Sequence, residues 1–175
     1  MIDQEGAFGW KKKRAVGDPR AIRFLTFSCV GRLPLFHRAE TKSRFLAALL
    51  QAGREGRLVV HAWVVMPEHV HLLLAPGAAG GPLPAEVARL KARFAAATLR
   101  LWDRERPGAV RRLTQPGGTR RFWQPGGGHD RWMRSLDDCA EKVGYIHGNP
   151  VRRGLVERAT EYRWSSAWGG TGPGQ

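Results

Sequence analysis

The chain has 175 residues, which is enough for one domain with a hydrophobic core but too few for a second full domain. Its 29 Lys and Arg against 15 Asp and Glu give a net charge of +14, which favours a partner with a phosphate backbone, namely nucleic acid. The sequence shows no long apolar run, no signal-peptide pattern, and no metal or disulfide spacing of its two cysteines, so we expect a cytoplasmic protein without a membrane span.

The N-terminal part predicts a basic arm, then a strand and a helix. Residues 1–20 have little apolar periodicity, which is typical of a flexible arm that is solvated or contacts DNA. Residues 22–30 are β-branched and aromatic, as in a strand. Thr41 is expected to cap a helix that continues to about Glu55. The arm carries four consecutive basic residues, Lys11, Lys12, Lys13 and Arg14.

The middle of the chain predicts a hairpin and a second helix. Residues 58–66 and 69–75 are typical of strands, and because only two residues separate them we expect them to pair. A break rich in Gly and Pro follows. Apolar side chains then recur at helical spacing, at Val87, Leu90, Phe94, Ala97 and Leu101.

The C-terminal part predicts a further strand and helix. Residues 106–121 are expected to form a flexible basic loop, and 122–124 a short fourth strand. Ser135 has the spacing of a capping box and opens a helix that Pro150 is expected to limit to about His147.

The order of these elements predicts the fold class. Strand, helix, strand, strand, helix, strand, helix is the order of an α+β, ferredoxin-like split β-α-β-β-α-β antiparallel sheet with an added C-terminal helix. We expect one domain over residues 21–168, between the arm at 1–20 and a flexible tail at 169–175.

Two histidines flank a valine in the third expected strand. Because side chains alternate along a strand, His69 and His71 project from the same face, side by side, as two metal ligands would. Surface and core histidines are commoner than ligands, so the pair alone does not establish a metal site. Glu68 fits either a hydrogen-bond partner of a ligating histidine or a carboxylate of the hairpin turn.

Tyr145 and Asn149 stand four residues apart and share one face of the last expected helix. A tyrosine hydroxyl can attack a phosphodiester and hold a covalent phosphotyrosine, provided that the phosphate is polarised, as by a divalent metal. Asn149 could add a third ligand to the two histidines. From spacing alone, Tyr145 also fits a half-buried core aromatic and Asn149 a helix C-cap.

Two segments of the chain carry a family resemblance. MPEHVHLLL, followed later by YIHGNPVRRGLV, resembles the single-strand DNA transposases of the HUH tyrosine-nuclease superfamily. The sequence is most similar to the REP-associated tyrosine transposases, relatives of small bacterial insertion-sequence transposases. The similarity covers about residues 22–168, including RFWQPGGGHDR and the ending RWSSAW.

The resemblance implies a function and roles for single residues. It implies that His69 and His71 bind Mg²⁺ or Mn²⁺, that Asn149 completes the metal site and that Tyr145 is the nucleophile. The implied activity is that of an endonuclease and strand transferase on hairpin-forming, REP-like single-stranded DNA, with a 5′-phosphotyrosine intermediate and a free 3′-OH. The REP-associated branch is expected to act as a monomer, whereas insertion-sequence relatives are dimers.

DNA binding is expected to depend on basic residues spread along the chain. Two other functions remain open: a module that binds a nucleic-acid hairpin without cutting it, and a metal-dependent nuclease that uses water in place of Tyr145. The roles of His129 and Lys142 are also open. The DNA-binding candidates are Lys11, Lys12, Lys13, Arg14, Arg111, Arg112, Arg120, Arg121, Arg152 and Arg153.

Overall fold

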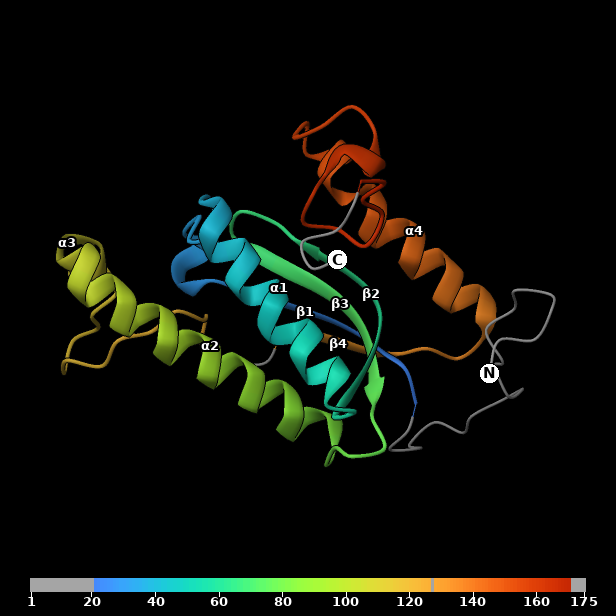
Figure 1. Cartoon of the computed structure of the whole chain (residues 1–175), viewed down its shortest axis with the longest axis horizontal. Coiled ribbons are helices and arrows are strands. Elements are labelled where there is room, and N and C mark those ends of the chain that lie inside the picture. Colours follow the sequence, from blue (N-terminus) through green and yellow to red (C-terminus); the bar gives the residue numbers. More distant parts are fainter. Residues whose placement is uncertain (1–20, 127, 171–175) are drawn as a thin grey trace.

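A four-stranded antiparallel sheet forms the centre of the molecule (Figure 1). The structure, a computed structural model, describes residues 21–126 and 128–170, so the expected basic arm and the end of the tail lie outside it. The strands lie in the order β2-β3-β1-β4, and each neighbouring pair is antiparallel. The predicted α+β architecture and the predicted hairpin are therefore confirmed. The strands are β1 (Arg23–Ser28), β2 (Leu58–Val65), β3 (His69–Pro76) and β4 (His129–Trp132).

Helices cover both faces of this sheet. Helices α1 (Ala39–Arg54) and α2 (Leu83–Glu105) belong to one hydrophobic core, and α4 (Leu136–Arg152) belongs to the core on the other face. A short helix, α3 (Pro107–Arg112), follows α2. No helix among the described residues is long and apolar enough to cross a membrane.

Alternation along β1 and β3 decides which side chains meet α4. Phe24 of β1 and Leu73 of β3 lie in the core with Ile146 of α4, whereas Phe27 of β1 lies in the core with Phe45 of α1. His69 and His71 have the same parity as Leu73, so they face α4, as a shared face requires.

The structure corrects four expectations about element boundaries. Thr41 does not cap α1, because the helix begins at Ala39 and Thr41 is buried inside it. Residues 106–121 are not wholly a loop, since they contain α3. The segment 122–124 makes only an isolated bridge, between Trp123 and Cys29, and the fourth strand lies further along the chain. Finally, α4 continues through Pro150 to Arg152.

The apolar stripe of α2 is also shifted from the predicted one. Leu90 and Phe94 are buried as expected, but further along the helix Thr98 and Trp102 are buried, whereas Ala97 is exposed. The buried positions thus recur every four residues in this part of α2.

Candidate active site

Strand β3 presents a converging pair of imidazoles beneath α4. His69 and His71 are each only 5% exposed, and their Nε2 atoms lie 3.0 Å apart. Two nitrogen ligands about 2.1 Å from one ion, at about 90° to each other, are separated by about 3.0 Å. The spacing of the two Nε2 atoms therefore fits two ligands of a single metal ion.

The other ring nitrogen of each histidine, Nδ1, has a hydrogen-bond partner on the protein. Nδ1 of His71 is hydrogen-bonded to the hydroxyl of Thr26, which is its register partner on β1, at 2.7 Å. Nδ1 of His69 lies 3.1 Å from a carboxylate oxygen of Glu68, which also accepts a hydrogen bond of 2.9 Å from Arg153. Such partners orient metal-binding imidazoles, so Glu68 fits the role of a hydrogen-bond partner.

Burial sets the protonation state of the pair. It lowers the pKa of both rings, and with the additional effect of His69 it lowers the pKa of His71 to about 3. Burial works to raise the pKa of Glu68, yet this pKa lies below its usual value because His69 and Arg153 lie next to the carboxylate. At pH 7 the site therefore holds neutral imidazoles, the form that binds metals.

Helix α4 brings Tyr145 to this pair. Its ring is edge-on to His71, with 5.3 Å between ring centroids, and edge-on to Phe24 at 5.8 Å. Two cations flank the ring, Arg152 at 4.5 Å and Lys142 at 5.7 Å from its centroid. Tyr145 is 41% exposed, so a large substrate can reach it.

Asn149 lies one turn after Tyr145 on the same helix and is buried, with 6% exposure. Its interpretation as a C-cap is wrong, because α4 ends at Arg152 and the C-cap is Arg153. Pro150 has no N–H to donate to the carbonyl of Ile146, and its own carbonyl accepts a hydrogen bond from the N–H of Leu155 just beyond the helix. The helix thus keeps Asn149 on the buried side of α4.

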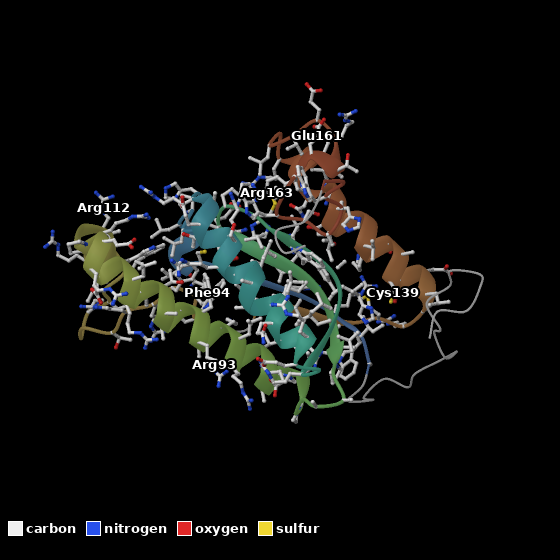
Figure 2. All side chains as sticks on the ribbon, in the orientation of Figure 1. Arg93, Phe94, Arg112, Cys139, Glu161 and Arg163 are labelled. Carbon is white, nitrogen blue, oxygen red and sulfur yellow. The ribbon has the colours of Figure 1, made fainter. Side chains whose placement is uncertain are left out.

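The predicted DNA-binding residues fall into separate groups. Arg152 and Arg153 contact Tyr145 and Glu68 and so belong to the site itself. Arg111 and Arg112 are exposed on α3, which lies at the opposite end of the molecule from α4 (Figures 1 and 2). The other described candidates, Arg120, which pairs with Asp103, and Arg121, lie in the segment after α3; residues 11–14 lie outside the described residues.

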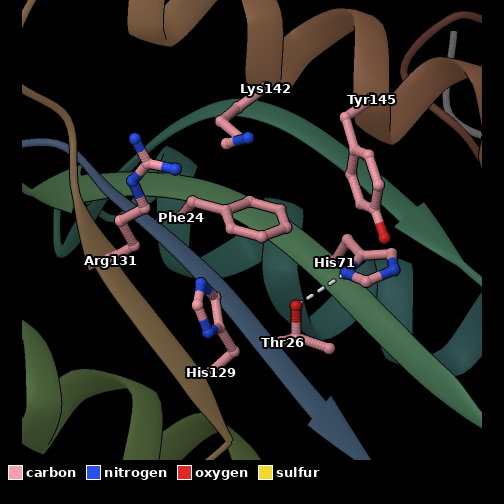
Figure 3. A pocket seen from close by; sticks show the side chains of 7 residues that line it. All are labelled: Phe24, Thr26, His71, His129, Arg131, Lys142 and Tyr145. Atoms are coloured by element: carbon pink, nitrogen blue, oxygen red, sulfur yellow. Dashed lines mark hydrogen bonds between the residues drawn. The ribbon is translucent and has the colours of Figure 1, made fainter.

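Three further residues of the site carried no assigned role in the sequence. Thr26 and, from β4, His129 and Arg131 line a pocket beside Tyr145 (Figure 3). Thr26 could not be found from spacing, because its contact with His71 depends on the register between β1 and β3. The alternation of His129 and Arg131 is a usable signal once residues 129–132 are assigned to a strand.

Comparison with known proteins identifies solved structures that are similar to this chain. No protein-family model and no curated protein matches the sequence. One match is the crystal structure of a proposed transposase from Deinococcus radiodurans R1. The two sequences are 23% identical, the match covers 81% of this chain and 95% of that chain, and the TM-score is 0.45. The structure of a REP-associated tyrosine transposase bound to a REP hairpin is 21% identical over 90% of this chain and 82% of that chain, with a TM-score of 0.61. The chain therefore has the fold of a REP-associated tyrosine transposase.

Proposed function

We propose that the protein is a REP-associated tyrosine transposase, a metal-dependent endonuclease and strand transferase that acts on hairpin-forming single-stranded DNA through Tyr145. The observation that carries this proposal is the position of Tyr145 over His71, although the two residues come from distant parts of the sequence. The net charge of +14 suits a DNA partner, and the similar transposase is bound to a REP hairpin.

The residues around the histidine pair fit a divalent metal. His69 and His71 would hold Mg²⁺ or Mn²⁺ through Nε2, and imidazole ligation favours Mn²⁺ on affinity. No three His, Cys, Asp or Glu side chains gather as a metal site in residues 21–126 and 128–170. The third protein ligand would be the amide oxygen of Asn149, which is buried on α4 one turn after Tyr145. A bound ion would polarise the phosphate and stabilise the charge of the leaving oxygen.

The chemistry assigned to Tyr145 is a reversible phosphoryl transfer. Its hydroxyl oxygen forms a bond to phosphorus, the bond from phosphorus to the 3′-oxygen breaks, and the proton lost by the tyrosine is balanced by the one that the leaving 3′-oxygen gains. The products are a 5′-phosphotyrosine and a free 3′-OH, which can attack in reverse and rejoin strands. Lys142 and Arg152 place positive charge beside the phosphate under attack.

The test is the formation of a covalent adduct. Labelled hairpin oligonucleotides copied from repeats that flank the gene are incubated with the protein and Mn²⁺ and analysed under denaturing conditions. We expect an adduct with the wild type and none with Tyr145→Phe, which should still bind the hairpin. Tyr162→Phe is the matched control, because Tyr162 is the only other tyrosine and its buried hydroxyl bonds to the carbonyl of Val65.

Three outcomes would contradict the proposal, each in a different way. Cleavage by Tyr145→Phe would make water the nucleophile. Hairpin binding by the wild type without cleavage of any such hairpin would make the protein a binding module. Cleavage that is unaffected by EDTA or by His71→Ala would remove the metal from the reaction.

A further inference from the structure

A cavity of about 380 Å³ opens beside Tyr145 (Figure 3). Its lining comes from four elements: β1 contributes Phe24 and Thr26, β3 contributes His71, β4 contributes His129 and Arg131, and α4 contributes Lys142 and Tyr145 itself. A volume of this size lies in the range of pockets that bind small ligands. His71, which is assigned to the metal, forms one side of this cavity, and the metal-binding roles leave Phe24, His129 and Arg131 on its other sides without a function.

The alternation of β4 turns His129 and Arg131 towards the cavity. His129 is the register partner of Thr26, and Arg131 is the register partner of Phe24, so these side chains lie on the face that α4 covers. The intervening Asp130 points to the other face, where it forms an ion pair with Arg23, and Arg23 in turn lies 4.4 Å from the ring of Trp132. These contacts fix which side of β4 faces Tyr145.

The lining combines aromatic rings with cations. Phe24 and His129 meet edge to face, with 5.8 Å between ring centroids. The Arg131 side chain is 40% exposed, and its contact with the carboxylate of Asp138 is long at 3.7 Å. Lys142 is 13% exposed and pairs with Glu141. Rings that can contact a base, next to cations that can contact phosphate, match the chemistry of one unpaired nucleotide.

We propose that this cavity binds the first nucleotide of the strand that stays attached to Tyr145. The assignment rests on the proposed function and on in-line displacement, which places the leaving 3′-oxygen on the side of phosphorus opposite to the attacking tyrosine oxygen. The nucleotide that leaves is thus directed away from Tyr145, whereas the nucleotide joined through its 5′-oxygen stays bonded to the phosphorus that Tyr145 holds, next to the cavity that Tyr145 lines. Its base lies against Phe24 and His129, and Arg131 contacts its polar edge or the next phosphate.

This role would give the cavity a part in rejoining as well as cutting. Once the 3′-OH strand has left, the attached strand would be held by the phosphotyrosine bond and by its first nucleotide. The phosphorus would then keep its orientation for attack by an incoming 3′-OH, because two contacts rather than one fix the strand.

The experiment first identifies the nucleotide and then removes its base. A pool of hairpin oligonucleotides with randomised single-stranded flanks is incubated with the wild type and Mn²⁺, and the DNA attached to Tyr145 is sequenced. The recovered oligonucleotide is made again with an abasic site at the first or at the second attached nucleotide. We expect the abasic site at the first nucleotide to slow adduct formation at limiting DNA by about tenfold, the size of one lost stacking contact, and the other site to slow it less.

Variants of the cavity then test the assignment. Arg131→Ala and His129→Ala should each slow adduct formation on the intact oligonucleotide and should each shrink the additional loss caused by the first abasic site, because the two changes remove parts of the same contact. Arg44→Ala is the matched control: it removes an exposed arginine of α1, on the other face of the sheet, and should keep the full abasic loss.

The outcomes separate this inference from the proposed function. An adduct whose rate does not depend on the first base, or whose abasic loss is undiminished in both cavity variants, would overturn the cavity assignment and leave the tyrosine mechanism standing. The absence of any adduct from the whole pool would overturn both.

Discussion

The hydrogen-bond partners of His69 and His71 determine which ring nitrogen of each carries its proton. Glu68 can only accept, so Nδ1 of His69 carries the proton and its Nε2 is free to accept from Nε2 of His71. A metal would displace that shared proton, and His71 would then carry its proton on Nδ1. The Thr26 hydroxyl can donate or accept, so its hydrogen bond to His71 survives the change.

This reasoning predicts the effect of Thr26→Val. The valine leaves a buried N–H of metal-bound His71 without a partner, which is costly. We expect the affinity for Mn²⁺ to fall by about 10- to 100-fold, as for other losses behind a ligating histidine, when it is measured by titration calorimetry without DNA. Thr26→Ser keeps the hydroxyl and should bind Mn²⁺ nearly as the wild type does. Equal affinities for Thr26→Val and the wild type would argue against His71 as a ligand.

At the scale of elements, local signals were sufficient where local contacts decide the structure. The strand of His69 and His71 follows from its apolar sequence, and its pairing with β2 follows from the short turn. The predicted position of the fourth strand is wrong because Phe122 is buried in the core and Trp123 packs against it, which resembles a strand, whereas residues 129–132 read HDRW and become a strand only by pairing with β1. That pairing joins segments far apart in sequence, and no local pattern encodes it.

In the candidate site, too, some features follow from local sequence and others depend on how distant elements pack. The shared face of His69 and His71 follows from alternation alone. The approach of Tyr145 to His71 depends on how α4 packs, which the burial of Ile146 and Cys139 against the sheet decides. Only the family resemblance indicated that approach in advance. The continuation of α4 past Pro150 is a further case in which burial of Asn149 and Pro150 prevails over a local rule.

Gly128 directly precedes β4, whose first residue, His129, lines the cavity, and a substitution at Gly128 gives a prediction at this scale. A Cβ atom at this position would lie 1.5 Å from the carbonyl oxygen of Thr26, so Gly128→Ala must push the start of β4 away from β1. We expect a loss of about 1–3 kcal/mol in the free energy of unfolding, measured with urea, because a side chain is forced into filled space. Adduct formation should slow as well, because His129 follows directly.

The matched control is an alanine at a glycine with open space around it. Gly144 lies within α4, and a Cβ there meets no atom within 4 Å. Gly144→Ala should therefore raise the free energy of unfolding by about 0.5–1 kcal/mol, through the lower entropy of the unfolded chain. If both variants changed stability in the same direction, the close approach of Gly128 to β1 would not be the cause of its effect.

For the whole molecule, the proposed function predicts that different groups of cations serve cleavage and DNA binding. Arg152 and Lys142 lie beside Tyr145, the proposed nucleophile, on the face of the sheet that α4 covers. Arg111 and Arg112 lie on α3, far from that face along the longest axis of the molecule (Figure 1). A hairpin is long enough to reach beyond one face, so residues of the second group can contribute affinity without touching the reacting phosphate.

The last prediction concerns these distant arginines. In the double variant Arg111→Ala and Arg112→Ala, we expect hairpin binding in EDTA to weaken and the slope of log Kd against log salt concentration to decrease by about 1–2, since each lost phosphate contact removes about 0.9. The rate of adduct formation at saturating DNA should stay at the wild-type value, because neither residue approaches Tyr145. The control removes the same charge from exposed positions of α1, through Arg44→Ala and Arg54→Ala, and tests whether net charge alone changes the slope. An unchanged slope in the α3 variant would place the hairpin elsewhere, whereas a slower rate at saturation would mean that α3 helps to position the scissile strand.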